Sequence, residues 1–205
     1  MIAAKAEIEN TLIARNDVAA GLINAIFADG VDFVRPEDLR DAPLDATYES
    51  IGRLRGLRRD VAKYFVENDR CECVFAFEIQ SAIDPTMPVR VLGYDGVGYR
   101  DELENSILKE EFGIGADHIV PIFTTVLYFG DQRWRDRRKL SECATMSERV
   151  ARFMRPFFDD FEIRVVDFAG MSDDELRNYP ADIRIIAEYF RCRRNGGNTF
   201  RLKSR

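Results

Sequence analysis

Apolar residues along this chain recur with two different spacings, and the alternation between them predicts an α/β protein. Residues 18–27 carry apolar side chains three and four positions apart, the spacing that lines one face of a helix. Asn16 or Asp17 can cap the start of this helix, and Gly30 is placed to end it. Residues 31–57 contain two prolines and many acids, and we expect loop with short elements there.

A pair of strands with a tight turn is predicted next. Residues 58–66 and 71–80 have the composition of strands, and residues 67–70 have that of the turn between them. The second strand is apolar through its middle, which is typical of an interior strand. Because the turn is short, the two strands are expected to pair antiparallel.

The second half of the chain continues this alternation. Ser172 and Glu175 form a capping-box pattern that opens the last helix, and Pro180 is expected to divide it. No repeat or linker-like stretch interrupts the pattern, so we predict one α/β domain over residues 1–205, with a mixed central sheet flanked by helices. The other elements expected here are a helix from Pro88 to about Leu103, a polar connection at 105–117, a strand at 119–129, a helix at 147–158 and a shorter strand at 162–168.

Composition places the chain among folded, intracellular proteins. Of its 205 residues, 46% are hydrophobic and 32% are charged, as in ordinary globular domains. No apolar run approaches the roughly 20 residues that cross a bilayer. The N-terminal segment lacks the basic and apolar regions of a signal peptide, and the four cysteines contain no CxxC pair. We therefore expect a cytoplasmic protein without a membrane partner.

Positive charge is clustered even though the net charge is −6. One cluster contains Arg58 and Arg59, a second contains Arg133 and Arg135, and a third lies in residues 191–205. Such clusters are either solvated surface or contacts to nucleic-acid phosphates. For the first two clusters both interpretations stay open, whereas the tail favours solvated surface.

Candidate catalytic residues are concentrated on the predicted pair of strands. Glu78 and Gln80 are two residues apart on a strand, so their side chains share a face. Asp60, on the neighbouring strand, can lie near them if the strands are antiparallel. Phe77 and Ile79 then face the other way, into the core. A charge that interrupts an apolar strand has to be paired or has to bind a cation.

Two interpretations of Glu78 are open. In the first, Asp60, Glu78 and the backbone carbonyl of Ile79 form an oxygen-only site for Mg²⁺, with Mn²⁺ as an alternative ion. Such a site activates water for attack on a phosphodiester. In the second, Glu78 forms a structural ion pair with Arg58 or Arg59, and the spacing alone favours this second interpretation.

The sequence around these strands resembles a known protein family. Residues 77–95 contain a Glu-x-Gln strand end followed by Ile-Asp, Met-Pro, Arg and Tyr-Asp at that family's offsets. Residues 58–61, 125–134 and 33–39 match further segments of its pattern in order. Over about residues 10–170 the chain therefore resembles the recombination-promoting nuclease/transposase family of the PD-(D/E)xK nuclease superfamily.

This resemblance implies a restriction-endonuclease-like fold and a magnesium-dependent DNA endonuclease linked to recombination or mobile elements. It implies metal ligands at Asp60 and Glu78, and it places Gln80 where the superfamily often has Lys. Glutamine can hydrogen-bond in the reaction but brings no charge. Ile79 stands where Asn is common, which does not matter if only its carbonyl binds the metal. The residues expected to contact nucleic acid are Arg58, Arg59, Arg90, Arg133 and Arg135, although Arg90 can instead form an ion pair that orients the hairpin.

Several alternatives stay open at this point. A further acidic ligand can come from Glu49, Glu9 or Asp17. A catalytically silent module that keeps the fold and binds DNA or protein is the rival function. A third candidate function is that of a dimeric structural partner, as a homodimer, for which residues 128–129 and 157–158 are the apolar candidates for an exposed face.

Overall fold

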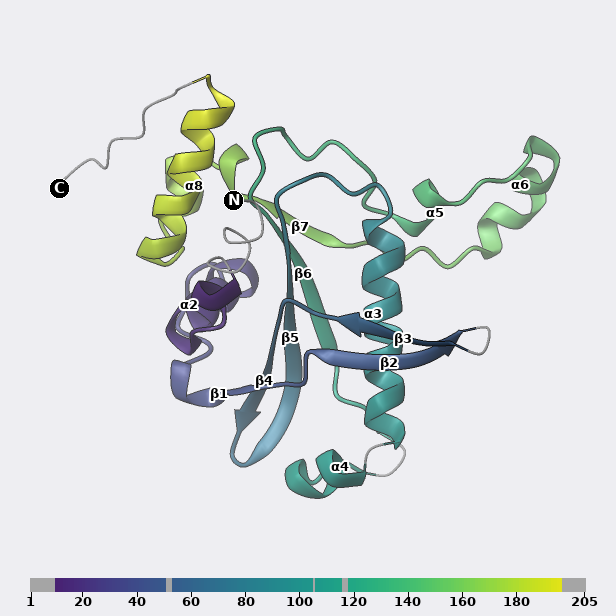
Figure 1. Ribbon diagram of the computed structural model, residues 1–205, viewed down its shortest axis with the longest axis horizontal. Coiled ribbons are helices and arrows are strands. Elements are labelled where there is room, and N and C mark those ends of the chain that lie inside the picture. Colours follow the sequence, from purple (N-terminus) through teal and green to yellow (C-terminus); the bar gives the residue numbers. More distant parts are fainter. Residues whose placement is uncertain (1–9, 51–52, 105, 116–117, 197–205) are drawn as a thin grey trace.

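The computed structural model describes residues 10–50, 53–104, 106–115 and 118–196, which form an α/β structure around a five-stranded mixed sheet (Figure 1). The strand order is β1-β4-β5-β6-β7, and a separate hairpin consists of β2 and β3. The strands are β1 (Leu39–Asp41), β2 (Asp45–Ser50), β3 (Arg53–Arg58), β4 (Val61–Glu67), β5 (Arg70–Gln80), β6 (Ile122–Tyr128) and β7 (Arg164–Asp167). The predicted α/β class with a mixed, helix-flanked sheet is confirmed.

The predicted antiparallel pair is the β4–β5 hairpin. Its register sets Val61 opposite Phe77. Asn68 and Asp69 both have positive φ, 51° and 61°, as the two central residues of a type I′ turn require. This turn twists in the same sense as the strands, so a tight connection is possible without splaying them. The turn sets the antiparallel pairing, and a β-bulge that leaves Glu72 without a partner on β4 then shifts the register by one residue and brings residue 60 toward residue 78.

Parallel pairing begins after β5. Helix α3 (Met87–Glu104) carries the chain back across the sheet, so that β6 pairs parallel with β5, and β7 pairs parallel with β6. The register aligns Gln80 with Tyr128, and Tyr128 with Asp167. The carboxyl ends of three strands thus lie along one edge of the sheet, together with the start of β4.

Helices cover both faces of the sheet (Figure 1). Helices α2 (Asn16–Phe27) and α8 (Ala181–Arg194) pack on one face in the main hydrophobic core. Helix α3 packs on the other face, where Met87 and Val91 meet Val126, Tyr128 and Trp134 in a smaller core. The two sides of β5 therefore face two different apolar clusters.

Several local expectations in the first half of the chain were wrong. Helix α2 is preceded by Arg15 as its cap residue, with no side-chain cap bond. The amide of Asn16 instead donates to the carbonyls of Pro36 and Leu39 and fastens the helix to the next segment. Residues 31–57 do contain the short elements expected there, but with more regular structure than loop: the 3-10 helix η1 (Pro36–Asp38) is followed by strands β1, β2 and most of β3.

Two further element boundaries also differ from the predicted ones. The strand predicted from residue 58 is interrupted, since Arg58 ends β3 and the chain bends at Asp60 before β4 begins. The polar connection at 105–117 contains helix α4 (Ser106–Phe112).

The capping box at Ser172 and the division of the last helix at Pro180 are confirmed. The remaining elements are α5 (Leu140–Cys143), α6 (Glu148–Met154), η2 (Arg155–Phe157), η3 (Phe168–Gly170) and α7 (Asp173–Leu176).

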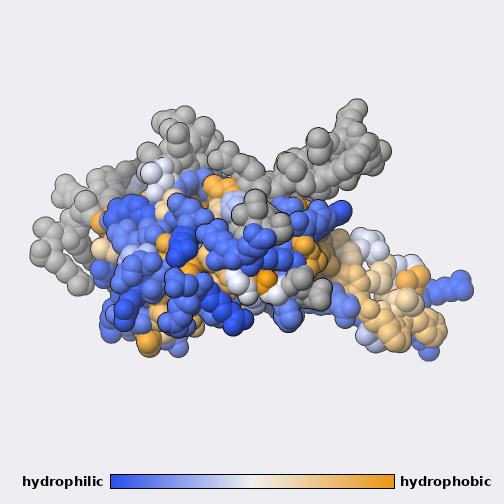
Figure 2. Space-filling model, turned by 90° about the horizontal axis from the view of Figure 1, so that it is seen from below, coloured by the Kyte–Doolittle hydropathy of each residue, from blue (hydrophilic) through white to orange (hydrophobic). Residues whose placement is uncertain are grey.

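An arm formed by α5, α6 and η2 projects from the sheet (Figure 1), and its surface is largely apolar (Figure 2). Phe157 is 79% exposed there, whereas Tyr128 and Phe129 are buried. The expectation of an exposed apolar face at residues 128–129 is therefore wrong, because both side chains fill the cores on either side of β6. Within the described residues, no helix has the length and apolar character needed to cross a membrane.

Candidate functional site

At the end of β5, successive side chains lie on opposite faces of the sheet, as predicted. Glu78 is in register with Val126, and Gln80 with Tyr128, and both partners belong to the core beneath α3. Ile79 and Phe77 belong to the main core on the opposite face. Glu78 and Gln80 therefore project together toward α3.

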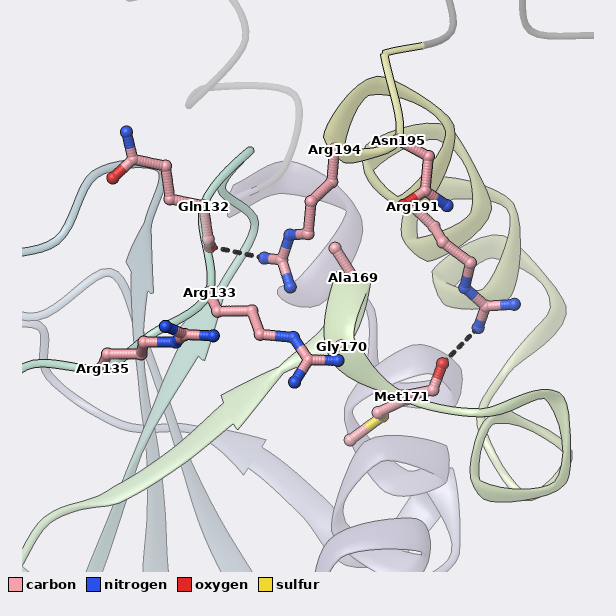
Figure 3. A pocket seen from close by; sticks show the side chains of 9 residues that line it. All are labelled: Gln132, Arg133, Arg135, Ala169, Gly170, Met171, Arg191, Arg194 and Asn195. Atoms are coloured by element: carbon pink, nitrogen blue, oxygen red, sulfur yellow. Dashed lines mark hydrogen bonds between the residues drawn. The ribbon is translucent and has the colours of Figure 1, made fainter.

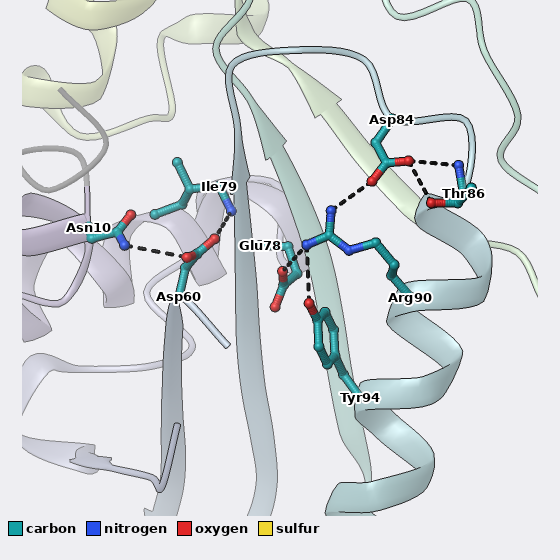
Figure 4. A network of polar contacts seen from close by, with 8 residues as sticks. All are labelled: Asn10, Asp60, Glu78, Ile79, Asp84, Thr86, Arg90 and Tyr94. Carbon is teal, nitrogen blue, oxygen red and sulfur yellow. Dashed lines mark hydrogen bonds and ion pairs between the residues drawn. The ribbon is translucent and has the colours of Figure 1, made fainter. Parts of the chain in front are cut away.

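Asp60 meets this strand end from the neighbouring strand (Figure 4). Its Oδ2 accepts a hydrogen bond from the backbone N–H of Ile79 at 2.7 Å, and its Oδ1 accepts one from Asn10 Nδ2 at 3.4 Å. In a β-strand the N–H and C=O of one residue point to the same side, so the Ile79 carbonyl is also directed to the edge where Asp60 lies. A carboxylate has about four acceptor sites, and these two bonds leave capacity for a cation.

Glu78 is a buried carboxylate with an incomplete set of partners. It is 1% exposed, and its Oε1 has no hydrogen-bond partner among the described residues. Burial, with a smaller contribution from the negative charge of Asp60, raises the pKa of Glu78 from 4.5 to about 8, while Arg90 and Arg59 oppose the change. At neutral pH this side chain therefore holds a proton unless a cation compensates its charge.

Arg90 is the cation beside Glu78. Its Nη2 lies 4.0 Å from Glu78 Oε2, and its guanidinium donates to Asp84 at 2.7 Å and to the Tyr94 hydroxyl at 3.1 Å (Figure 4). The side chain is 38% exposed, so part of Arg90 is accessible to solvent. The sequence offered Arg58 or Arg59 as the ion-pair partner, but among the described side chains the one that contacts Glu78 is Arg90.

Arg59 belongs to a separate buried network. It is 8% exposed, and it donates to Asp95 at 3.0 Å and to Thr124 at 3.0 Å, while the Thr124 hydroxyl bonds Asp95 at 2.6 Å. These bonds tie the start of β4 to α3 and β6, which fixes the backbone next to Asp60. Asp95 thus positions Arg59, a role that the sequence analysis did not assign to it. The signal that could have indicated this role is the acid of the Tyr-Asp motif, which lies on a helix that packs against the sheet.

The basic residues after β6 lie at the same sheet edge as Gln80. Arg133 and Arg135 are exposed, and they line a surface hollow of about 620 Å³ together with Arg191 and Arg194 (Figure 3). The side chain of Arg58, the other arginine expected to contact nucleic acid, lies outside the described part of the structure.

A third acidic ligand is not found among the described residues. Asp17 is exposed and pairs with Arg15 at 2.6 Å, while Glu9 and the side chain of Glu49 lie outside what the structure describes. In the described ranges, no group of three or more His, Cys, Asp and Glu side chains could hold a metal ion. A cation at this site would thus be held by Asp60, Glu78 and the backbone carbonyl of Ile79.

Comparison of the chain with protein-family models, with curated proteins and with solved structures finds no match.

Proposed function

We propose that this chain is a metal-dependent DNA endonuclease of the PD-(D/E)xK type. The observation that carries the proposal is the convergence of Asp60 with a buried, incompletely partnered Glu78 at the end of β5. The mixed sheet with helices on both faces agrees with a restriction-endonuclease-like fold. The motif at residues 77–95, which resembles that of the recombination-promoting nucleases, supports the same function.

The donor set fits a hard divalent cation. Two carboxylates and a carbonyl provide only oxygen atoms, which Mg²⁺ and Mn²⁺ prefer. Glu78 Oε1, buried without a partner in the described structure, is the kind of atom that a cation would satisfy. When bound, Mg²⁺ or Mn²⁺ supplies an activated water and neutralises charge on the phosphate under attack.

The residues of the chain divide the remaining tasks. The Ile79 N–H holds the Asp60 carboxylate in place, and Arg90 holds Glu78 from the α3 side. A cation that binds Glu78 displaces the proton that burial retains there and compensates the charge that this leaves. Gln80 shares the face of Glu78, so its amide can hydrogen-bond to a phosphate oxygen or to the attacking water.

The sheet edge offers a path for the DNA backbone. Arg133 and Arg135 are exposed at the end of β6, and Arg90 is partly exposed beside Glu78. We propose these three arginines as phosphate contacts. Arg59 receives a structural role in this proposal, because its guanidinium is buried against Asp95.

Plasmid nicking by the purified chain tests the proposal. We expect cleavage with Mg²⁺ or Mn²⁺ and none with EDTA. Asp60→Asn and Glu78→Gln should each reduce the rate at least 100-fold. Asp159→Asn and Glu188→Gln remove the same charges from exposed acids elsewhere and should leave the rate unchanged. Cleavage that persists in EDTA, or that survives both site substitutions, would contradict the proposed mechanism.

The projecting arm favours a second candidate function, that of a protein-interaction module. Phe153 and Phe157, with Val150 and Met154, expose apolar side chains on α6 and η2. Contiguous exposed apolar surface is typical of protein–protein contacts. This alternative predicts no cleavage with any metal, together with self-association that Phe153→Ser and Phe157→Ser abolish in sedimentation experiments.

A further inference from the structure

The hollow beside β7 has an unusual lining. Its walls come from the loop after β6, from η3 and from the last turn of α8, which are far apart in sequence (Figure 3). Four of the residues that line it are arginines, and none is an acid. The complete lining is Gln132, Arg133, Arg135, Ala169, Gly170, Met171, Arg191, Arg194 and Asn195.

Two of the four arginines form a fixed wall. Arg194, whose side chain is 12% exposed, donates to the carbonyls of Gly130 and Gln132 at 2.9 and 2.6 Å and pairs with Asp167 at 2.8 Å. Arg191 pairs with Asp173 and donates to the Met171 carbonyl at 2.6 Å.

The Nε atoms of Arg191 and Arg194 are buried and have no hydrogen-bond partner in the described structure, so the wall presents its fixed guanidinium groups to the hollow as positive charge. The ion pair between Arg194 and Asp167 leaves little room for a side chain at Gly170. A β-carbon there would lie 3.3 Å from Asp167 Oδ2 and 3.4 Å from Arg194 Nη1. A residue without a side chain thus keeps this ion pair undisturbed.

The other two arginines supply positive charge that the described residues do not neutralise. Arg133 and Arg135 are exposed and form no ion pair with any described residue. Arg133 extends across the hollow toward Gly170, and Arg135 lies on the other side of the Arg133 backbone in the view (Figure 3). Asp167 and Asp173 balance Arg194 and Arg191, so a surplus of two positive charges remains. This surplus of positive charge attracts an anion into the hollow.

We infer that this hollow binds a backbone phosphate of the DNA whose cleavage is proposed above, at a position away from the scissile bond. The inference rests on that proposed function. Gln80, Tyr128 and Asp167 are in register on neighbouring strands, so Asp167, which pairs with Arg194 of the hollow, lies about 10 Å from Gln80 at a strand spacing of about 4.8 Å. With a rise of about 3.4 Å per nucleotide along the duplex axis, that distance spans at most roughly three nucleotides. Guanidinium groups are the side chains best suited to phosphate oxygens.

The test uses two matched pairs of substitutions in the full chain. Arg133→Gln with Arg135→Gln removes two charges from the hollow, and Arg137→Gln with Arg138→Gln removes two exposed charges of the same segment that do not line it. Duplex DNA binding is measured by fluorescence anisotropy in EDTA at several salt concentrations. We expect the first pair to weaken binding roughly 10-fold or more and to reduce the salt slope by about 1, with less than a threefold effect of the second pair.

A neutral-linkage scan then locates the phosphate. Oligonucleotides carrying one methylphosphonate at successive positions are titrated against both the unsubstituted chain and the Arg133→Gln, Arg135→Gln variant. At one position, the methylphosphonate should weaken binding of the oligonucleotide to the unsubstituted chain but not to the variant. A flat scan, equal effects of the two substitution pairs, or equal competition by polyglutamate would overturn the inference.

The outcomes separate this inference from the proposed catalysis. If the chain binds DNA through Arg133 and Arg135 but cleaves nothing with Mg²⁺ or Mn²⁺, the phosphate site stands and the nuclease proposal fails. If the chain cleaves DNA and the two substitution pairs behave alike, the nuclease proposal stands and the phosphate site fails. Both variants should melt within about 2 °C of the unsubstituted chain, since exposed, unpaired arginines contribute little to stability.

Discussion

Replacing Glu78 with glutamine should stabilise the metal-free protein, and the size of the effect should depend on pH. Burial raises the pKa of Glu78 from 4.5 to about 8 in the folded protein. Between these two values the folded state holds a proton that the unfolded chain has released, so the free energy of unfolding falls as pH rises from about 4.5 to about 8. The full loss above pH 8 is on the order of 3–5 kcal/mol.

The substitution Glu78→Gln removes this loss, because an amide of the same size does not ionise. It also strands no partner: Arg90 keeps its bonds to Asp84 at 2.7 Å and to Tyr94 at 3.1 Å. For a chain of this size, each kcal/mol corresponds to roughly 2–4 °C in melting temperature. We therefore expect the variant to melt several degrees above the unsubstituted protein at pH 8.5 and close to it at pH 5.

The measurement is thermal unfolding in EDTA at pH 5 and pH 8.5. Glu72→Gln is the matched control, since Glu72 is on the same strand and exposed, and its variant should follow the pH response of the unsubstituted protein. Added Mn²⁺ should raise the melting temperature of the unsubstituted protein and not that of Glu78→Gln. A Glu78→Gln protein that is less stable at both pH values would refute the reasoning and support a structural ion pair with Arg90.

Three further outcomes are expected. Asp60→Ala leaves the Ile79 N–H without its acceptor and should lower the free energy of unfolding by about 1–3 kcal/mol, whereas Asp60→Asn keeps an acceptor oxygen and should cost less than about 1 kcal/mol; urea titrations of both variants measure the difference. Asp95→Ala should cost about 3–5 kcal/mol in the same titration, because it leaves the guanidinium of Arg59 buried with only Thr124 as a partner. A crystal soaked in Mn²⁺ should show an anomalous peak about 2.1 Å from oxygens of Asp60 and Glu78, and a peak elsewhere would contradict the proposed site.

Local patterns were sufficient to predict the strand that carries the candidate site. The apolar run that ends in Glu-x-Gln indicated an interior strand with Glu78 and Gln80 on one face, and β5 has this arrangement. The Asn-Asp turn indicated the antiparallel partner, and the β4–β5 register brings Asp60 to the end of β5. These features follow from side-chain alternation and turn conformation, which depend on residues close together in sequence.

Contacts between distant segments could not be obtained in this way. Arg59 appeared in a basic cluster that was a candidate for DNA contact, but it is buried because Asp95 of α3 and Thr124 of β6 both bond its guanidinium. The partner of Glu78 among the described residues is Arg90, one helix away. Likewise, Arg194 of the last helix lines a hollow with Arg133 only because parallel pairing aligns β6 and β7. The sequence shows that a charge is present, but its burial and its partners depend on how the elements pack, since desolvation and ion pairing are properties of the folded environment.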